Sequence, residues 1–458
     1  MNYEESVRSL LALGRELAAP RQPALSSAPG ALVQKFGLEN IQTLSAELGN
    51  PHLSVPCVHI AGTNGKGSTA AMVESILRAA GLRTGLYTSP HLERINERIR
   101  IDGDEISDEA FAAAWTRVQA AIESLMASGK LASHPTFFEC VTAIAFLAFA
   151  DHRIGFAVYE VGLGGRLDST NIVQPEVAIL TPIDFDHENF LGHSIEEIAG
   201  EKAGIIKPGA SIVAAPQSPE AISVIRRRAA ELSARLVEVD AVWKAKDVIT
   251  AGNGRYRAVA SSSLSNRTID IAPALAGKFQ IHNALTAATA GYLLAERGFS
   301  VESNAVQRGI AEVRWPGRLE KVSDEPSIYL DGAHNPAAAR ELRKFWEENF
   351  AGRRIFLVYG AMRDKAVDEI AGVLFPVTQG VILTQPRQSR AISAPLLAEM
   401  TGGLAPTTMI VPDPVDALER ALAIAAPHDV IFATGSLFLV GDLRHYWKSR
   451  AAKISHTS

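Results

Sequence analysis

The stretch from Val55 to Gly81 constrains the fold more than any other part of the chain. Val55–Ile60 is a short β-branched run, Gly62–Ser68 reads GTNGKGS, and Ser68–Ala80 has apolar residues at helical spacing. This order predicts a strand, a glycine-rich loop and a helix that ends near Gly81. Backbone N–H groups of such a loop can approach phosphate oxygens, and the helix N-terminus adds positive potential. The sequence therefore predicts a phosphate-binding loop.

The loop departs from the common pattern GxxxxGK[ST] in two ways. Its first glycine stands three residues before Gly65, and Gly67 separates Lys66 from the hydroxyl of Ser68. Lys66 can still reach the β- and γ-phosphates, and Ser68 can still hold Mg²⁺. The alternative is a plain glycine-rich turn with a solvated lysine. The position between a predicted strand and a predicted helix favours nucleotide binding.

The alternation of strands and helices continues beyond the loop. The first part of the chain predicts helices around a loop at Arg21–Gly30, and Val239–Ile271 is short, alternating and turn-rich, which indicates a small antiparallel insertion. Elsewhere we expect strands at Arg83–Thr88, Gly155–Glu160, Glu176–Thr181 and Ser211–Ala214, and helices at Phe137–Ala150, Ser194–Ile205 and Ala284–Arg297. Repeated strand–helix units predict a mainly parallel sheet covered on both faces.

A second α/β domain is expected after the segment RWPGRL, Arg314–Leu319, where Pro316 and Gly317 favour a compact turn. The alternation restarts there, with strands predicted at Ser327–Leu330, Arg354–Tyr359, Gly380–Thr384, Thr408–Val411 and Asp429–Ala433. We predict an N-terminal domain over residues 1–313, a linker over 314–320 and a smaller doubly wound domain over 321–458.

Composition limits the classes of protein that the chain can be. Its 458 residues are 47% hydrophobic and 21% charged, which is typical of a soluble globular enzyme, and the net charge of −5 argues against a nucleic-acid partner. The N-terminal stretch lacks a signal peptide and no apolar run could cross a bilayer, so we expect a cytoplasmic protein without a membrane partner. Cys57 and Cys140 have no CxxC partner and are expected to be buried thiols.

Six further segments accompany the glycine loop. They are SPHLERINERIRI (Ser89–Ile101), EVGLGGRLDSTN (Glu160–Asn171), DHENFLG (Asp186–Gly192), EKAGIIKPG (Glu201–Gly209), PGRLE (Pro316–Glu320) and DGAHNP (Asp331–Pro336). With GTNGKGS, and in this order, they resemble the dihydrofolate synthase/folylpolyglutamate synthase family of the Mur ligase superfamily, with weaker agreement at TGSLFLVGDLR (Thr434–Arg444). The resemblance implies an N-terminal P-loop ATPase domain, a smaller C-terminal Rossmann-like domain, and an active site in the cleft between them.

The resemblance also implies an ATP site shared by the two domains. The residues implied to contact ATP are Gly62, Thr63, Asn64, Gly65, Lys66, Gly67, Ser68, Asn283, Arg318 and Asp331. Asn283 opens the predicted alanine-rich helix, where it could also be a cap. Arg318 and Asp331 come from the linker and the second domain, so ATP binding would be coupled to domain closure.

A Mg²⁺ site is implied with the ligands Ser68, Ser89, Glu160, His187 and Lys202. Glu160 ends a predicted strand, and the carboxyl ends of strands in an open parallel sheet face the ligand crevice. His187 and Ser89 alone would be a surface histidine and a turn serine, and histidine is an unusual ligand for Mg²⁺. The spacing around Lys202 favours an exposed helix lysine. In the superfamily the matching lysine is N6-carboxylated, which converts the cation into an anion that can orient Mg²⁺.

Catalytic roles are implied for Lys66, Lys202 and His334, and the incoming amino acid is expected near His334 and Ser436. The residues implied to lie near a pterin-bearing substrate are Thr136, Phe137, Phe138, Glu139, Leu167, Asp168 and Ser169. Aromatic faces can stack on a flat pterin ring, although the pattern alone places at least one of the two phenylalanines in the core.

We therefore expect an ATP- and Mg²⁺-dependent ligase that acts, as a monomer, on small molecules only. It would add L-glutamate to dihydropteroate, to the γ-carboxylate of (tetrahydro)folate, or to both, through an acyl phosphate. The alternatives are folylpolyglutamate synthesis alone, another Mur-type ligase, a P-loop ATPase or kinase that needs no amino acid, and a binding module with a degenerate site.

Overall fold

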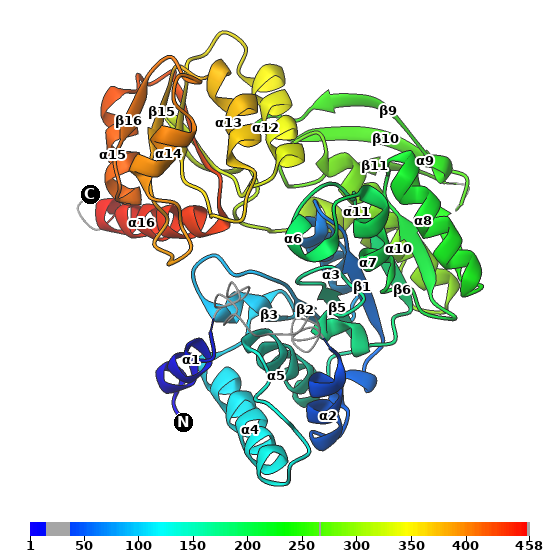
Figure 1. Cartoon of the computed structure of the whole chain (residues 1–458). Coiled ribbons are helices and arrows are strands. Elements are labelled where there is room, and N and C mark those ends of the chain that lie inside the picture. The colour runs from blue at the N-terminus through cyan, green and yellow to red at the C-terminus, as the bar shows by residue number, and fades with distance from the viewer. Residues whose placement is uncertain (15–36, 265–266, 456–458) are drawn as a thin grey trace.

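The computed structural model describes residues 1–14, 37–264 and 267–455, which form two lobes, each built on its own main sheet (Figure 1). The predicted loop at Arg21–Gly30 lies outside the described residues. We call the part with the eight-stranded sheet the first lobe and the part with the six-stranded sheet the second lobe. Both sheets are mainly parallel and carry helices on both faces, so the predicted α/β fold is confirmed.

The main sheet of the first lobe has the strand order β4-β3-β2-β5-β1-β6-β7-β8, in which β2, β5, β1, β6, β7 and β8 pair in parallel and β3 and β4 add an antiparallel edge. Its strands are β1 Cys57–Ala61, β2 Thr84–Tyr87, β3 Ile99–Ile101, β4 Asp104–Glu105, β5 Phe156–Glu160, β6 Val177–Leu180, β7 Ser211–Ala214 and β8 Arg235–Glu238. The strands predicted from sequence are confirmed. The edge strand β8 was not predicted because it is short and only Val237 is fully buried.

Helices cover both faces of this sheet, because successive side chains of each strand point to opposite faces. Val58 and Ile60 of β1 join a core with α3 and α10, whereas Cys57 of β1 and Tyr159 of β5 join a core with α4 and α5. The helices of the first lobe are α1 Tyr3–Ala12, α2 Glu39–Glu47, α3 Lys66–Ala79, α4 Asp108–Ala127, α5 Phe137–Asp151, α6 Glu188–Leu191, α7 Ile195–Ala203, α8 Pro219–Glu231, α9 Val239–Val242, α10 Gln280–Glu296 and α11 Ser303–Glu312. Both cysteines are free and buried, as expected.

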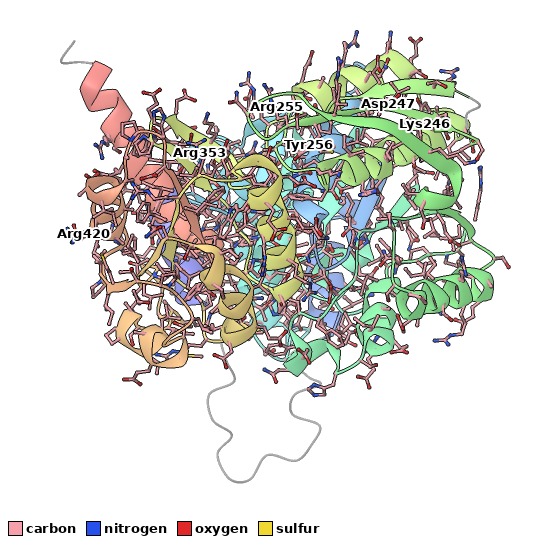
Figure 2. The ribbon with its side chains drawn as sticks, turned by 90° about the horizontal axis from the view of Figure 1, so that it is seen from above. Lys246, Asp247, Arg255, Tyr256, Arg353 and Arg420 are labelled. Atoms are coloured by element: carbon pink, nitrogen blue, oxygen red, sulfur yellow. The ribbon has the colours of Figure 1, made fainter. Side chains whose placement is uncertain are left out.

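The predicted antiparallel insertion is confirmed as a three-stranded sheet in the order β11-β10-β9, formed by β9 Trp243–Thr250, β10 Tyr256–Ser262 and β11 Arg267–Ile271. Trp243 anchors it to α10 through an indole N–H that donates to Thr289 Oγ1 at 2.9 Å. On the other side, the Tyr256 hydroxyl donates to Glu348 Oε2 at 2.7 Å in the second lobe, and Figure 2 labels this tyrosine. The insertion therefore contacts both lobes.

The sheet of the second lobe has the order β12-β13-β17-β14-β15-β16, in which β12 pairs antiparallel with β13 and the other pairs are parallel. Its strands are β12 Glu320–Asp324, β13 Ser327–Leu330, β14 Ile355–Tyr359, β15 Gly380–Leu383, β16 Thr408–Ile410 and β17 Val430–Thr434. Its helices are α12 Pro336–Asn349, α13 Val367–Leu374, α14 Ala394–Met400, α15 Pro414–Ile424 and α16 Leu437–Ser455. Separate apolar clusters lie on the two faces, as a doubly wound sheet requires.

The chain crosses from α11 to β12 through residues 313–319, which form no helix or strand. The predicted domain limits, 1–313 and 321–458 with a linker over 314–320, remain a proposal. Within the described residues, no helix is long and apolar enough to span a membrane.

Candidate active site between the lobes

A cavity of about 710 Å³ lies between the two lobes and is lined by residues from both. Its wall includes all the residues that the sequence predicts to contact ATP or a metal, and the predicted catalytic histidine as well. They are Gly62, Thr63, Asn64, Gly65, Lys66, Gly67, Ser68, Ser89, Glu160, His187, Lys202, Asn283, Arg318, Asp331 and His334. Segments that are far apart in the sequence thus share one cavity, although their individual roles stay predictions.

Sheet topology explains why these segments meet. Gly62 follows β1 and Glu160 ends β5, while Ser89 and His187 follow β2 and β6 a few residues on. These four strands are neighbours and run in parallel, so their carboxyl ends lie at one edge of the sheet. Ligands of open α/β sheets bind at this edge.

The glycines of the loop allow two close approaches. Gly65 has φ 85°, and a Cβ there would lie 2.7 Å from Asn283 Oδ1. A Cβ on Gly67 would lie 2.9 Å from the indole nitrogen of Trp315, which belongs to the segment between the lobes. The packing of Trp315 therefore explains why glycine replaces a larger residue after Lys66. Asn283 lies inside α10, which begins at Gln280, so the prediction that Asn283 opens this helix was wrong.

Lys66 and Lys202 both donate to the backbone of the loop. Lys66 Nζ lies 3.0 Å from Gly62 O and 3.2 Å from Thr63 O, and Lys202 Nζ lies 2.9 Å from Gly62 O. Burial lowers the pKa of Lys66, although Glu160 and Asp186 oppose this shift. Burial, followed by the charge of Lys66, lowers the pKa of Lys202 to about 7. Lys202 is only 4% exposed, so the surface position favoured by its spacing was wrong.

Glu160 and Ser89 provide oxygen atoms at the same sheet edge. Glu160 is 4% exposed, and its Oε2 accepts a hydrogen bond from the backbone N–H of Ser89 at 3.3 Å. Carboxylate and hydroxyl oxygens are ligands that Mg²⁺ prefers. Across residues 1–14, 37–264 and 267–455, no group of three or more His, Cys, Asp or Glu side chains could hold a metal ion. The predicted ligand set contains only two such side chains, Glu160 and His187, so this result does not test it.

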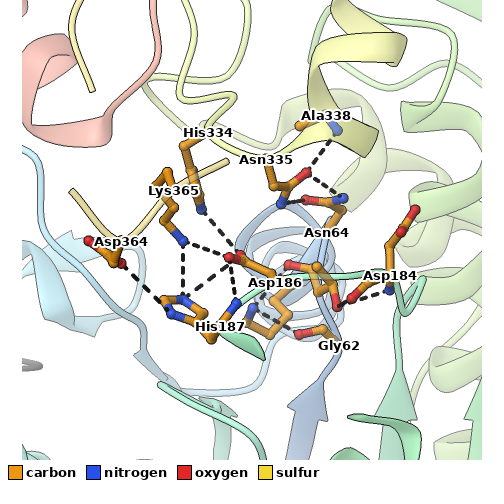
Figure 3. Close-up of polar contacts among 12 residues, drawn as sticks. Gly62, Asn64, Asp184, Asp186, His187, His334, Asn335, Ala338, Asp364 and Lys365 are labelled. Carbon is orange, nitrogen blue, oxygen red and sulfur yellow. Dashed lines mark hydrogen bonds and ion pairs between the residues drawn. The ribbon is translucent and has the colours of Figure 1, made fainter. Parts of the chain in front are cut away.

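Asp186 forms a polar contact between the lobes (Figure 3). Its Oδ1 accepts from Lys365 Nζ at 2.7 Å and from the backbone N–H of His187 at 2.9 Å, and its Oδ2 lies 3.7 Å from His334 Nε2. Burial would raise the pKa of Asp186, but His334 and Lys365 outweigh it and hold the pKa well below its usual range. Burial and the charge of Lys365 lower the pKa of His187 to about 3.

Further contacts tie the second lobe to the phosphate-binding loop. The side-chain amides of Asn64 and Asn335 exchange hydrogen bonds of 2.9 and 3.3 Å, and Asn335 also caps α12 by accepting from the N–H of Ala338 (Figure 3). Asp331 accepts from the N–H groups of Leu319 and Ala333 at 2.9 Å, beside the partly buried Arg318. Burial lowers the pKa of Arg318, although the charges of Asp331 and Glu160 act against this.

The predicted substrate residues are not in the cavity wall. Ser436 is buried beside the cavity residue Leu437, and its Oγ accepts from the N–H of Phe438. Phe137 is a core residue, as the pattern indicated for one of the two aromatics, whereas Phe138 is partly buried. The remaining five lie near helix ends and are Thr136, Glu139, Leu167, Asp168 and Ser169.

Hydrogen bonds within the protein occupy three polar side chains of this group, those of Thr136, Glu139 and Asp168. Thr136 and Glu139 form the capping box of α5. Asp168 Oδ2 accepts from the N–H groups of Gly162 and Leu163, and its Oδ1 accepts from Thr170. These three side chains therefore shape the backbone of their loops, and contact with a substrate stays a prediction.

Comparison with known proteins agrees with this architecture. A model of the Mur ligase middle domain matches residues 60–291, and one of the Mur ligase glutamate ligase domain matches residues 317–437. The chain is 37% identical over 417 residues to a dihydrofolate synthase/folylpolyglutamate synthase of Bacillus subtilis, which covers 90% of this chain and 94% of the relative. The chain belongs to the dihydrofolate synthase/folylpolyglutamate synthase family of Mur ligases.

Solved structures of this family superpose closely on the chain. A Mycobacterium tuberculosis folylpolyglutamate synthase complexed with ADP matches with a TM-score of 0.85 and 32% identity, covering 96% of this chain and 99% of that chain. An E. coli FolC in complex with DHPP and ADP matches with a TM-score of 0.82 and 29% identity, covering 98% and 99%.

Three residues that line this Mur ligase site or contact residues of its wall were missed in the sequence. Asp186 stood in the DHENFLG segment, but only the neighbouring His187 was singled out. Asn335 lies in the DGAHNP segment, directly before Pro336. An Asn followed by a Pro is typical of a helix N-cap, and this pattern could have identified Asn335. Lys365 lies between β14 and α13, and no local pattern indicates that it reaches a carboxylate 179 residues away.

Proposed function

We propose that the chain catalyses the ATP-dependent addition of L-glutamate to dihydropteroate and to the γ-carboxylate of (tetrahydro)folate, through an acyl phosphate. The observation that carries the proposal is the shared cavity, in which a phosphate-binding loop faces polar groups of a second lobe. The names of the relatives and the ADP and DHPP complexes support the substrate class. Synthesis of folylpolyglutamate alone and another Mur-type ligation are the alternatives.

ATP would bind with its phosphates at the Gly62–Ser68 loop. N–H groups at the start of α3 and the ammonium of Lys66 would hold the β- and γ-phosphates. Arg318 and Asp331 would contact the nucleotide from the linker and the second lobe, so that bound ATP favours closure of the two lobes. The hydrogen bond between Asn335 of the second lobe and Asn64 of the loop would form in the same closed state.

Mg²⁺ fits the donors present, because Glu160, Ser89 and Ser68 offer oxygen atoms at the sheet edge. When bound, the ion would offset phosphate charge and polarise the transferred phosphoryl group. Lys202 fits carboxylation, because a pKa of about 7 leaves much of its amine neutral and able to add CO₂ with release of a proton. His187 fits less directly, because Lys365 Nζ lies 3.3 Å from its Nε2.

The chemistry then needs two bond changes in a site that excludes water. The substrate carboxylate attacks the γ-phosphorus, which gives an acyl phosphate and ADP. The amine of glutamate, once its ammonium has lost a proton, attacks the acyl carbon, and the tetrahedral intermediate gives up a second proton from nitrogen as it expels phosphate to leave an amide. Lys66 would stabilise charge on the phosphoryl group in transit, and the closed lobes would protect the acyl phosphate from hydrolysis.

A substrate panel tests the proposal. ADP release is measured with dihydropteroate, tetrahydrofolate and a UDP-sugar peptide, each with and without L-glutamate, and the product mass is determined. We expect release that requires L-glutamate together with either pterin substrate, and a product heavier by one glutamyl residue. Lys66→Ala should abolish release, whereas Lys246→Ala, at an exposed position on β9, should not. ADP release without an amino acid, or only with the peptide, would overturn the proposal.

A further inference from the structure

The Ser89–Arg98 loop runs from the cavity wall to a contact with helix α16 of the second lobe. It begins after β2, and the backbone N–H of Ser89 donates to Glu160 Oε2 at the cavity wall. Three residues further on, Leu92 packs against the apolar cluster of the second lobe that includes Val440 and Leu443 of α16. One short loop therefore contacts a predicted metal ligand at one end and the second lobe in its middle.

Glycine at position 441 permits this contact. Gly441 lies within α16, and a Cβ there would lie 2.1 Å from the carbonyl oxygen of Leu92 and 2.8 Å from its carbonyl carbon. Glycine is disfavoured in helix interiors, so its presence here fits a need for close approach. The atoms in the way belong to the backbone, so they cannot rotate aside.

A charge cluster whose central pair, Glu93 and Arg444, is mostly buried lies beside this contact. Arg444 Nη1 donates to Glu93 Oε1 at 2.6 Å, and Arg444 Nε donates to both carboxylate oxygens of Glu320 at 3.0 Å. Lys448 Nζ adds a bond of 2.7 Å to Glu93 Oε1, and His445 lies 3.3 Å from Oε2. The side chains of Glu93 and Arg444 are 12% and 17% exposed, so solvent screens this pair much less than a surface pair.

The loop is held as a unit by Glu97. Its carboxylate accepts hydrogen bonds from the backbone N–H groups of Leu92, Glu93 and Arg94, at 2.7, 2.8 and 2.9 Å. A displacement at Leu92 or Glu93 is therefore expected to reach the rest of the loop, including Ser89. The position of Ser89 beside Glu160 would then depend on whether α16 is in place.

We propose that Gly441 and Arg444 of α16 are positioning residues, which seat the Ser89–Arg98 loop so that Ser89 faces Glu160 only when the two lobes are together. Helix α16 thus affects the position of Ser89 through the loop, although α16 itself does not contact Ser89. The proposal rests on the proposed function for its kinetic readout, but its structural readout is independent of activity.

Two pairs of variants of the full chain test the proposal. Gly441→Ala inserts a methyl group against Leu92, and its control Gly372→Ala changes a helix glycine of α13 that has open space around it. Arg444→Met removes the bond to Glu93, and its control Arg450→Met removes an ion pair with Glu419 that lies on the same helix but within the second lobe. Arg444→Lys keeps the charge.

The structural readout is hydrogen exchange at the amides of Leu92, Glu93 and Arg94 in the protein without substrates. We expect exchange to rise about tenfold or more in Gly441→Ala and Arg444→Met and to change less than about twofold in both controls. The kinetic readout is ADP release, in which kcat should fall by about tenfold to a hundredfold while the KM for ATP changes less than about threefold. Arg444→Lys should recover part of kcat.

Unchanged exchange at these amides in folded Gly441→Ala and Arg444→Met, or an equal rise in the controls, would overturn the proposal. If Gly441→Ala does not fold, Arg444→Met decides the question. If the variants show this exchange pattern but the wild-type protein shows no glutamate-dependent ADP release, the proposed function is refuted and the positioning role is still supported.

Discussion

Replacing Asp186 with asparagine should favour separation of the two lobes. The carboxylate and the Lys365 ammonium are 2.7 Å apart and are 11% and 8% exposed. Removing one partner of such a buried pair costs about 3–5 kcal/mol, because the other charge is left unpaired. The two residues belong to different lobes, so opening the lobes returns Lys365 to water. The cost therefore falls on closure, which should weaken by roughly a hundredfold to a few thousandfold.

The assay is the distribution of distances between one fluorophore on each lobe, measured without substrates. Asp186→Asn should shift it toward the open form, and adding Lys365→Met should reverse much of the shift because no charge is then left unpaired. The control is Asp184→Asn, which loses a more exposed contact with Arg340 across the same interface, at 3.5 Å. Equal distance distributions for Asp186→Asn and Asp184→Asn would refute the reasoning.

Four further predictions concern Lys202, Gly67 and Asp186. Lys202→Ala should lose activity, measured as ADP release, and should partly regain it with added short carboxylates. A fully active Lys202→Ala would show that carboxylation of Lys202 is not needed for the reaction. The serine side chain of Gly67→Ser should clash with the Trp315 indole and weaken nucleotide binding about tenfold, as measured by calorimetric titration. The double variant Gly67→Ser/Trp315→Ala should bind the nucleotide more tightly than Gly67→Ser alone. The pKa of Asp186 is held below its unfolded value, which is about 4. Its carboxylate therefore stabilises closure fully above about pH 4, and this stabilisation is lost only as the pH falls through the depressed pKa of the folded protein. The distance distribution should therefore be the same at about pH 7 and about pH 5, and opening over that interval would contradict this assignment. The folded pKa of Lys202 is about 7 and its unfolded value is near 10.5, so in CO₂-free buffer the wild type should gain stability relative to Lys202→Met as the pH rises between these values, as measured by chemical denaturation.

Local patterns in the sequence were sufficient to predict most of the fold. The strands β1, β5 and β6 are apolar runs bounded by turn residues, and their order along the chain predicts a parallel sheet whose carboxyl ends meet. Glu160 could be placed at that edge because it ends β5. The edge strand β8 was not predicted because its alternation of buried and exposed residues is weak.

Contacts between distant segments could not be predicted in this way. Lys202 has the spacing of an exposed helix residue, and only the packing of α7 against the loop after β1 buries it. Asp186 and Lys365 meet only when the two lobes are assembled. Asp168 was predicted to lie near the substrate, which stays a prediction, but no motif indicates that its Oδ2 accepts hydrogen bonds from the backbone N–H groups of Gly162 and Leu163.

The account depends most on the place of the nucleotide. The direct measurement is a crystal structure of the protein with Mg²⁺ and a non-hydrolysable ATP analogue. We predict the β- and γ-phosphates at the amide of Gly65 and the ammonium of Lys66, with Arg318 and Asp331 contacting the nucleotide from the other side of the cavity. An analogue bound elsewhere, or a cavity that stays empty at saturating concentrations, would contradict the account.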